Sequence, residues 1–195
     1  MTNLNKKIKE NRGMTYIELI VVLSIFAIMS AVSMFNYRGF QAKIDIRNLA
    51  SDIALQIVGA QKNSIAGTLK LPIGISLDPN WKPSYGVYFD RSKPKQFIYF
   101  SDLNNDKFYE SGEELDTILI TKGDFISYLE TDCGGEITGD MNIVFTRPNS
   151  DAVITNNVVD CNVLNATIGI SSSDEVVKTN IVVYPSGRIQ IKNAD

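Results

Sequence analysis

The stretch between residues 102 and 113 has the spacing of a loop that binds a hard cation. Counted from Asp102, oxygen side chains fall at positions one, three, five, nine and twelve, and the residue at seven offers a backbone carbonyl. The set is Asp102, Asn104, Asp106, Phe108, Glu110 and Glu113. Ca²⁺ takes about six to eight oxygen ligands in loops of this kind. We therefore expect the stretch to bind Ca²⁺ and to brace a loop, with no catalytic role.

Two features of the same stretch keep another interpretation open. Lys107 stands where glycine usually makes the sharp turn, and its charge repels a cation. The flanking residues are typical of strands, whereas an EF-hand loop joins helices. The alternative is a solvated acidic hairpin loop stabilised by Asx turns.

The two cysteines, Cys133 and Cys161, are too few for a zinc knuckle. In an exported chain they predict a disulfide that closes a loop of about 30 residues and contributes about 3 kcal/mol. The alternative is a pair of buried free thiols. The chain has no histidine, so it lacks the commonest general base and transition-metal ligand. We expect no enzyme, although an exported enzyme that uses paired acids is a competing hypothesis.

The N-terminal segment has the composition of a membrane anchor. Residues 1–13 carry four Lys or Arg and one Glu, and Glu18 is the only charged residue between Met14 and Tyr37. The run 19–35 is apolar or small throughout, and a helix that spans a bilayer needs about 17 to 25 such residues. The basic flank predicts a cytoplasmic N-terminus and an exported chain after Arg38.

This segment fits a secretory signal peptide, a plain signal anchor or a third class of signal. The sequence Gly13-Met14-Thr15-Tyr16-Ile17-Glu18 resembles the class III leader of type IV pilins and pseudopilins. The resemblance implies cleavage by prepilin peptidase after Gly13, N-methylation of Met14, and a filament-assembly role for Glu18 beside the new amine of a neighbouring subunit. The competing interpretation of Glu18 is a carboxylate at the water interface with no partner.

The elements that must position these residues are one long helix and a β-rich head. The segment 14–37 is expected to span the membrane, and 38–67 to continue as an amphipathic helix that ends near Gly67 and packs on the head. The expected apolar stripe is Phe40, Ile44, Leu49, Ile53, Ile57 and Ala60.

The head, 68–195, alternates short apolar runs with turn residues, which is typical of antiparallel sheet. Strands are expected at 71–77, 85–90, 96–101, 116–121, 142–145, 166–171, 180–184 and 189–192. The predicted fold class is therefore α+β, a long N-terminal helix packed on an antiparallel sheet head.

The order of these elements, with Phe145-Thr146-Arg147-Pro148 and a final Gly187-Arg188 hairpin, resembles the H-type minor pseudopilins of the GspH/FimT family. The resemblance implies a pilin-like fold and a single-pass protein of the bacterial inner membrane with an exported head. It implies assembly into a type II secretion pseudopilus or a type IV pilus. Implied partners are other pilin subunits, prepilin peptidase, the inner-membrane assembly platform and membrane lipid.

The same family implies an alternative function, DNA binding for uptake in natural competence. Its basic stretch maps onto Arg188, with Lys192 nearby, but Gln190 stands where the family has a second arginine. Without residues 1–13 the chain has 15 basic residues (19 less four) and 21 acidic residues (22 less one), a net charge of −6. This charge disfavours DNA, whose binding needs several convergent cations.

Overall fold

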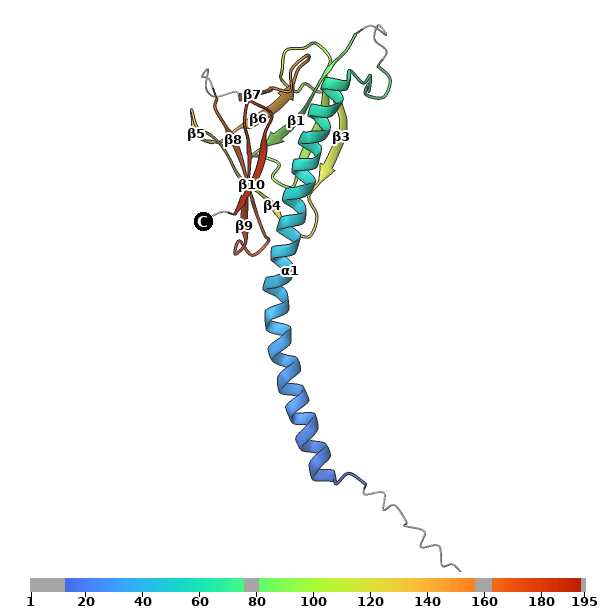
Figure 1. Cartoon of the computed structure of the whole chain (residues 1–195), viewed down its shortest axis with the longest axis vertical. Helices are drawn as coiled ribbons and strands as arrows, with labels where there is room; N and C mark the ends of the chain where they lie inside the picture. Colours follow the sequence, from blue (N-terminus) through green and yellow to red (C-terminus); the bar gives the residue numbers. More distant parts are fainter. Residues whose placement is uncertain (1–12, 76–80, 157–162, 194–195) are drawn as a thin grey trace, which may run out of the picture. The chain divides into compact units, whose positions relative to one another are not determined.

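The protein combines one long helix with two antiparallel sheets, as described by a computed structural model for residues 13–75, 81–156 and 163–193 (Figure 1). The expected leader residues 1–12 lie outside the described part. The chain divides into two compact units, residues 1–41 and 42–195. Helix α1 (Tyr16–Ala66) crosses the division and contributes residues to both units.

The ends of α1 follow from local sequence chemistry. At the start, the hydroxyl of Thr15 accepts the backbone N–H of Glu18 at 3.3 Å, the bond of an N-cap residue. At the end, Gly67 takes the left-handed conformation with φ of 59°. The Gly67 N–H then donates to Ser64 O and the Thr68 N–H to Asn63 O, which is a Schellman motif. The predicted helix is confirmed to within two residues at its start.

Within the described residues, ten strands form two five-stranded sheets, and every pairing there is antiparallel. The first sheet has the order β3-β2-β1-β6-β7 and contains β1 (Ser84–Asp90), β2 (Gln96–Asp102), β3 (Glu114–Leu119), β6 (Asp140–Phe145) and β7 (Ala152–Asn156). The second has the order β10-β9-β8-β4-β5 and contains β4 (Phe125–Thr131), β5 (Gly135–Ile137), β8 (Ala166–Ser171), β9 (Lys178–Val183) and β10 (Ile189–Asn193).

The part of α1 that belongs to the second unit packs its apolar face into the core. Five residues at alternating spacings of four and three are fully buried with residues of both sheets: Ile46, Ala50, Ile53, Ile57 and Ala60. The predicted stripe was right from Leu49 onward, since Leu49 is half-buried against the core, and wrong at its beginning. Phe40 is 62% exposed and Ile44 is 36% exposed, because the buried face begins at Ile46.

The strand predictions succeed where apolar runs are long and fail at four positions. Strands β4, β5 and β7 were not predicted, and the predicted strand at 71–77 is wrong over residues 71–75. Pro72 has no N–H to donate to a sheet, and Gly74 has φ of 88°, so the chain turns there and the Ile75 N–H bonds Pro72 O. Residues 76 and 77 lie outside the described part.

Candidate functional sites

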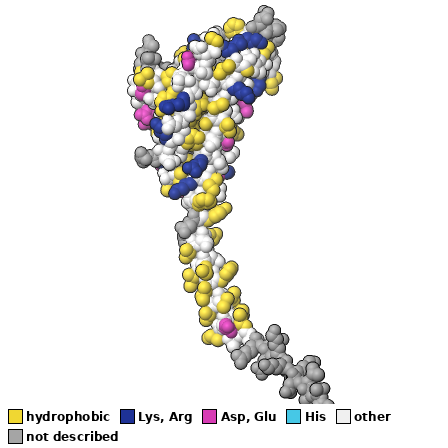
Figure 2. Space-filling model, in the orientation of Figure 1, with side chains coloured by type: hydrophobic (Ala, Val, Ile, Leu, Met, Phe, Trp, Pro, Cys, Tyr) yellow, Lys and Arg dark blue, Asp and Glu magenta, His cyan; other side chains and the backbone are white. Residues whose placement is uncertain are grey.

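The first candidate site is the exposed apolar part of α1. Every described side chain from Gly13 to Phe40 is exposed, and Figure 2 shows hydrophobic side chains along this helix. Among the described residues, α1 is the single helix long and apolar enough to cross a membrane. The described residues therefore contain one apolar surface of membrane-spanning length.

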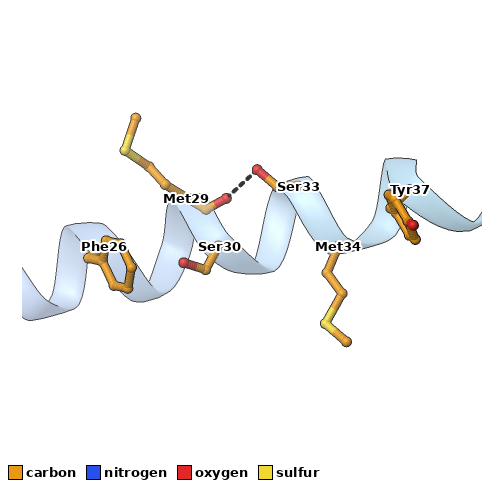
Figure 3. A pocket seen from close by; sticks show the side chains of 6 residues that line it. All are labelled: Phe26, Met29, Ser30, Ser33, Met34 and Tyr37. Carbon is orange, nitrogen blue, oxygen red and sulfur yellow. Dashed lines mark hydrogen bonds between the residues drawn. The ribbon is translucent and has the colours of Figure 1, made fainter.

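The polar groups within this apolar segment are hydrogen-bonded within the helix. The hydroxyl of Ser24 donates to Ile20 O at 2.7 Å, and that of Ser33 donates to Met29 O at 3.0 Å. Figure 3 shows the Ser33 bond beside Phe26, Met34 and Tyr37, which line a shallow groove (Figure 3). All the lining residues belong to one helix, so the groove is an open helix surface and encloses no ligand. A hydroxyl bonded to its own helix is suited to an apolar surrounding.

Glu18 lies in the first turn of α1, where it has a local role that the sequence analysis missed. Thr15 and Glu18 have the spacing of a capping box, and the bond from the Glu18 N–H to the Thr15 hydroxyl is present. A carboxylate in the first turn is also favoured by the helix dipole. The signal was visible as threonine followed three residues later by glutamate. The filament-assembly role of Glu18 and the cleavage at Gly13 and methylation at Met14 stay predictions.

The second candidate site is the connection between β2 and β3, which together with Asp102, the last residue of β2, contains all six predicted calcium ligands. As expected, this connection joins two strands of a sheet. Asp102 is 0% exposed and Glu113 is 5% exposed. Burial raises the pKa of Asp102, and the backbone N–H groups of Lys107, Asn105 and Asp106 lower it in part. Burial likewise raises the pKa of Glu113, the Leu103 and Glu110 N–H groups oppose it, and the charges of Asp102 and Asp106 add to it.

Backbone N–H groups donate to carboxylate oxygens of Asp102, Asp106 and Glu113 in this connection. Asp102 Oδ2 accepts the Lys107 N–H at 3.0 Å, and Asp106 Oδ1 accepts the Phe108 N–H at 2.8 Å. Glu113 Oε1 and Oε2 accept the N–H groups of Leu103 at 2.7 Å and Glu110 at 3.0 Å. The amide of Asn104 accepts the Asp106 N–H and donates to the side chains of Asp106 and Glu110.

The predicted Asx-turn character of the loop is present, and its calcium ligation stays a prediction. Among the described residues, no three acidic or cysteine side chains lie grouped as ligands of one metal ion. Lys107, which replaces the usual glycine, has φ of 70°, so it adopts the left-handed turn that glycine normally makes. The turn is thus formed despite the substitution.

The β2–β3 connection is attached to the outer face of the first sheet. The Tyr109 ring packs on Tyr88 at 4.7 Å and on Phe100 at 5.5 Å between centroids. Phe100 forms a second, smaller apolar cluster with Ile98 and Val144, and Tyr88 and Tyr109 pack against this cluster. Polar bonds add to the attachment: Tyr109 N–H to Asn142 Oδ1, Thr155 Oγ1 to Lys107 O, and Ser84 Oγ to Asn105 Oδ1.

The third candidate is the predicted disulfide. Cys133 lies in the turn between β4 and β5 and is disulfide-bonded. Cys161, the only other cysteine of the sequence, lies outside the described residues. Asp132, next to Cys133, binds the chain just after residue 163, because its Oδ1 accepts the Leu164 N–H at 2.8 Å and the Asn165 N–H at 3.1 Å.

The fourth candidate is the C-terminal hairpin with its basic residues. Arg188 is exposed, and its guanidinium lies 4.0 Å from the centre of the Tyr184 ring. Lys192 lies four residues further along the same hairpin, near the end of β10. Gly187 is required by close packing, since an added Cβ would lie 2.2 Å from both Gln61 Nε2 and Ser150 O. The Gly-Arg pair thus has a structural reason for its glycine, and DNA binding by Arg188 and Lys192 stays a prediction.

Comparison with known proteins adds no assignment to these four sites. No protein-family profile, no curated protein and no solved structure matches the chain. The class defined by the chain itself is an α+β protein with a long N-terminal helix, apolar over a membrane-spanning length, and two antiparallel sheets.

Proposed function

We propose that this chain is a minor pilin-like subunit of a type II secretion pseudopilus or a type IV pilus. The apolar part of α1 anchors it in the bacterial inner membrane with the sheets exported, until assembly into a filament. Prepilin peptidase cleaves after Gly13, and the new N-terminus at Met14 is methylated. The work is assembly with other pilin subunits on the inner-membrane platform, without turnover of a substrate.

One observation carries the proposal: a single continuous helix whose first part is apolar and exposed and whose second part is buried in the core of the head unit. A cleavable secretory signal has no reason to continue without a break into a core helix. The Ser24 and Ser33 hydroxyls are bonded to their own helix, as lipid or a neighbouring apolar helix requires. Glu18 is the single charge between residues 14 and 37, and acids in such segments are functional by default.

Cleavage is tested by co-expressing the full chain with prepilin peptidase and measuring its mass. We expect loss of 13 residues and a methylated Met14. Gly13→Leu should block the cut, and Gly39→Leu is the matched control, because an added Cβ contacts nothing within 4 Å at either glycine. An uncut wild-type chain, or equal cutting of both variants, would contradict the proposal.

Assembly is tested at Glu18 with two variants that separate its charge from its cap. Glu18→Gln removes the charge and leaves a good capping-box residue, whereas Thr15→Ala removes the cap and leaves the charge. We expect Glu18→Gln to lose crosslinking to a neighbouring pilin subunit while Thr15→Ala retains it. Loss of crosslinking in Thr15→Ala but not in Glu18→Gln would assign Glu18 to the helix cap alone.

The alternative function, DNA capture, depends on the exposed Arg188 stacked on Tyr184. Charge reversal by Arg188→Glu should abolish retention of DNA if this function is correct, and should leave filament assembly unchanged. Lys93→Glu is a suitable control, because Lys93 is also exposed and lies in the turn between β1 and β2. Equal retention by both variants and by the wild type would remove the alternative.

A further inference from the structure

Asp102, at the start of the β2–β3 connection, carries a buried carboxylate oxygen without a hydrogen-bond partner. Its Oδ2 accepts the Lys107 N–H, but its Oδ1 is inaccessible to solvent and has no hydrogen-bond partner. A buried carboxylate oxygen left without a partner is costly, so buried charges are normally paired or bound to a metal.

No protein cation compensates this charge within the described residues. The ion pairs there join Arg91 to Glu136, Lys93 to Asp90 and Lys122 to Asp45, all away from Asp102 and Glu113. The charges that act on Glu113 are those of Asp102 and Asp106, so the connection gathers like charges in one place. A like-charged group of this kind is stabilised when a cation binds among its members.

We infer that a Ca²⁺ ion binds in the β2–β3 connection, with Asp102 Oδ1 as its buried ligand and the Asp106 and Glu113 carboxylates drawn toward it. Asn104, Glu110 and the Phe108 carbonyl complete the set of oxygens available from the same loop. The carboxylates of Asp106 and Glu113 now rest on backbone N–H groups and on Asn104. Each carboxylate oxygen has a second lone pair, so metal ligation can accompany these bonds.

Oxygen ligands and net negative charge select a hard cation, and the flexible coordination of Ca²⁺ suits an irregular loop better than the strict octahedron of Mg²⁺. Binding would fix the turn that places Tyr109 over Tyr88 and Phe100. The ion would therefore keep Tyr109 packed over the small apolar cluster on the outer face of the first sheet. This site does not depend on the proposed function, because every group in it belongs to the unit formed by residues 42–195.

The test is thermal unfolding of the full chain in mild detergent, in EDTA, in millimolar CaCl₂ and in millimolar MgCl₂. Calcium at ten times its Kd should raise the folding equilibrium constant about tenfold, with a much smaller effect of magnesium. Asp102→Asn should abolish the calcium response without lowering the melting temperature in EDTA, because it removes the unpartnered buried charge. Lys107→Gly should bind calcium several-fold more tightly, because it removes the repelling cation and suits the positive φ.

A second measurement keeps the test independent of variant folding. Tb³⁺ replaces Ca²⁺ in oxygen sites, and a tyrosine close to the site sensitises its luminescence, so Tyr109→Phe should reduce the signal. Identical melting of the wild type in EDTA and calcium, or an equal calcium response in Asp102→Asn, would overturn the inference. Absence of tyrosine-sensitised terbium luminescence that calcium displaces would overturn it as well.

Discussion

The burial of α1 in the unit formed by residues 42–195 makes a quantitative prediction for two side chains two residues apart. Ile53 is 0% exposed within the main core cluster, whereas Leu55 is 66% exposed. Truncation of a buried Ile or Leu to Ala costs about 2–5 kcal/mol, because it removes apolar contacts and leaves a cavity. Exposed truncations stay within about 0.5 kcal/mol. We therefore expect Ile53→Ala to destabilise the unit by about 3 kcal/mol and Leu55→Ala to have little effect.

The assay is urea unfolding of the full chain in mild detergent, followed by the near-ultraviolet circular dichroism of the tyrosines. With a denaturant slope of about 2 kcal/mol per molar urea, Ile53→Ala should lower the midpoint by about 1.5 M. The slope itself should not change, because the same surface is exposed on unfolding. Similar midpoints for the two variants, or a larger loss at Leu55, would refute the assigned helix face.

Three further outcomes are expected in the same unit. Gly169→Ala places a Cβ 2.1 Å from the Tyr128 ring and should lower the free energy of unfolding by about 1–3 kcal/mol. In the double variant with Tyr128→Ala, the two losses of stability should be less than additive. Full additivity in urea unfolding would contradict the contact. Lys122→Ala breaks the 2.6 Å pair with Asp45, in which the lysine is exposed, and should lower the urea midpoint far less than Ile53→Ala, because ion pairs near solvent contribute little. A shift as large as that of Ile53→Ala would contradict this expectation. Burial, followed by the charges of Asp140, Asp90 and Tyr109, raises the pKa of Tyr88 from 10.0 to about 12. The neutral ring therefore adds stability below pH 10 that is lost as the pH rises through 12, and Tyr88→Phe should remove the latest step of a spectrophotometric titration.

The length and ends of α1 were predictable because local residues determine them. Thr15 caps the start, and Gly67 provides the left-handed residue that ends the helix. The buried face was less predictable. Phe40 and Ile44 are as apolar as Ile46, so periodicity alone does not distinguish them, and only contact with the sheets selects the face that begins at Ile46.

The missed strands have a similar physical origin. Strand β5 has only three residues, and β7 is an edge strand with one buried side chain, so neither carries a clear alternation. Strand β4 pairs with β8 through a register shift between Ile126 and Tyr128, which interrupts its period of two. Pairing with a neighbouring strand stabilises these segments, and that neighbouring strand cannot be identified from the residues of the segment itself.

The candidate cation loop was predictable in composition and unpredictable in its energetics. The spacing of oxygen side chains identified the residues, but spacing does not say which oxygen is buried. In the folded chain the Oδ1 of Asp102 is buried without a partner, and the loop packs on the first sheet through Tyr109. This buried oxygen without a partner is the feature by which the acidic hairpin favours a bound cation.

The local and the proposed roles of Glu18 have the same electrostatic basis. The first turn of a helix has unsatisfied N–H groups and the positive end of the dipole, so a carboxylate in an otherwise apolar segment is least costly there. The same position lies four residues from the N-terminus that cleavage after Gly13 would create, beside which a second positive charge could be placed by a neighbouring subunit. A cap role for Glu18 therefore does not argue against an assembly role. It explains how one acid is tolerated in the apolar segment before any neighbour is present, and it is why the charge and the cap must be removed separately, by Glu18→Gln and Thr15→Ala.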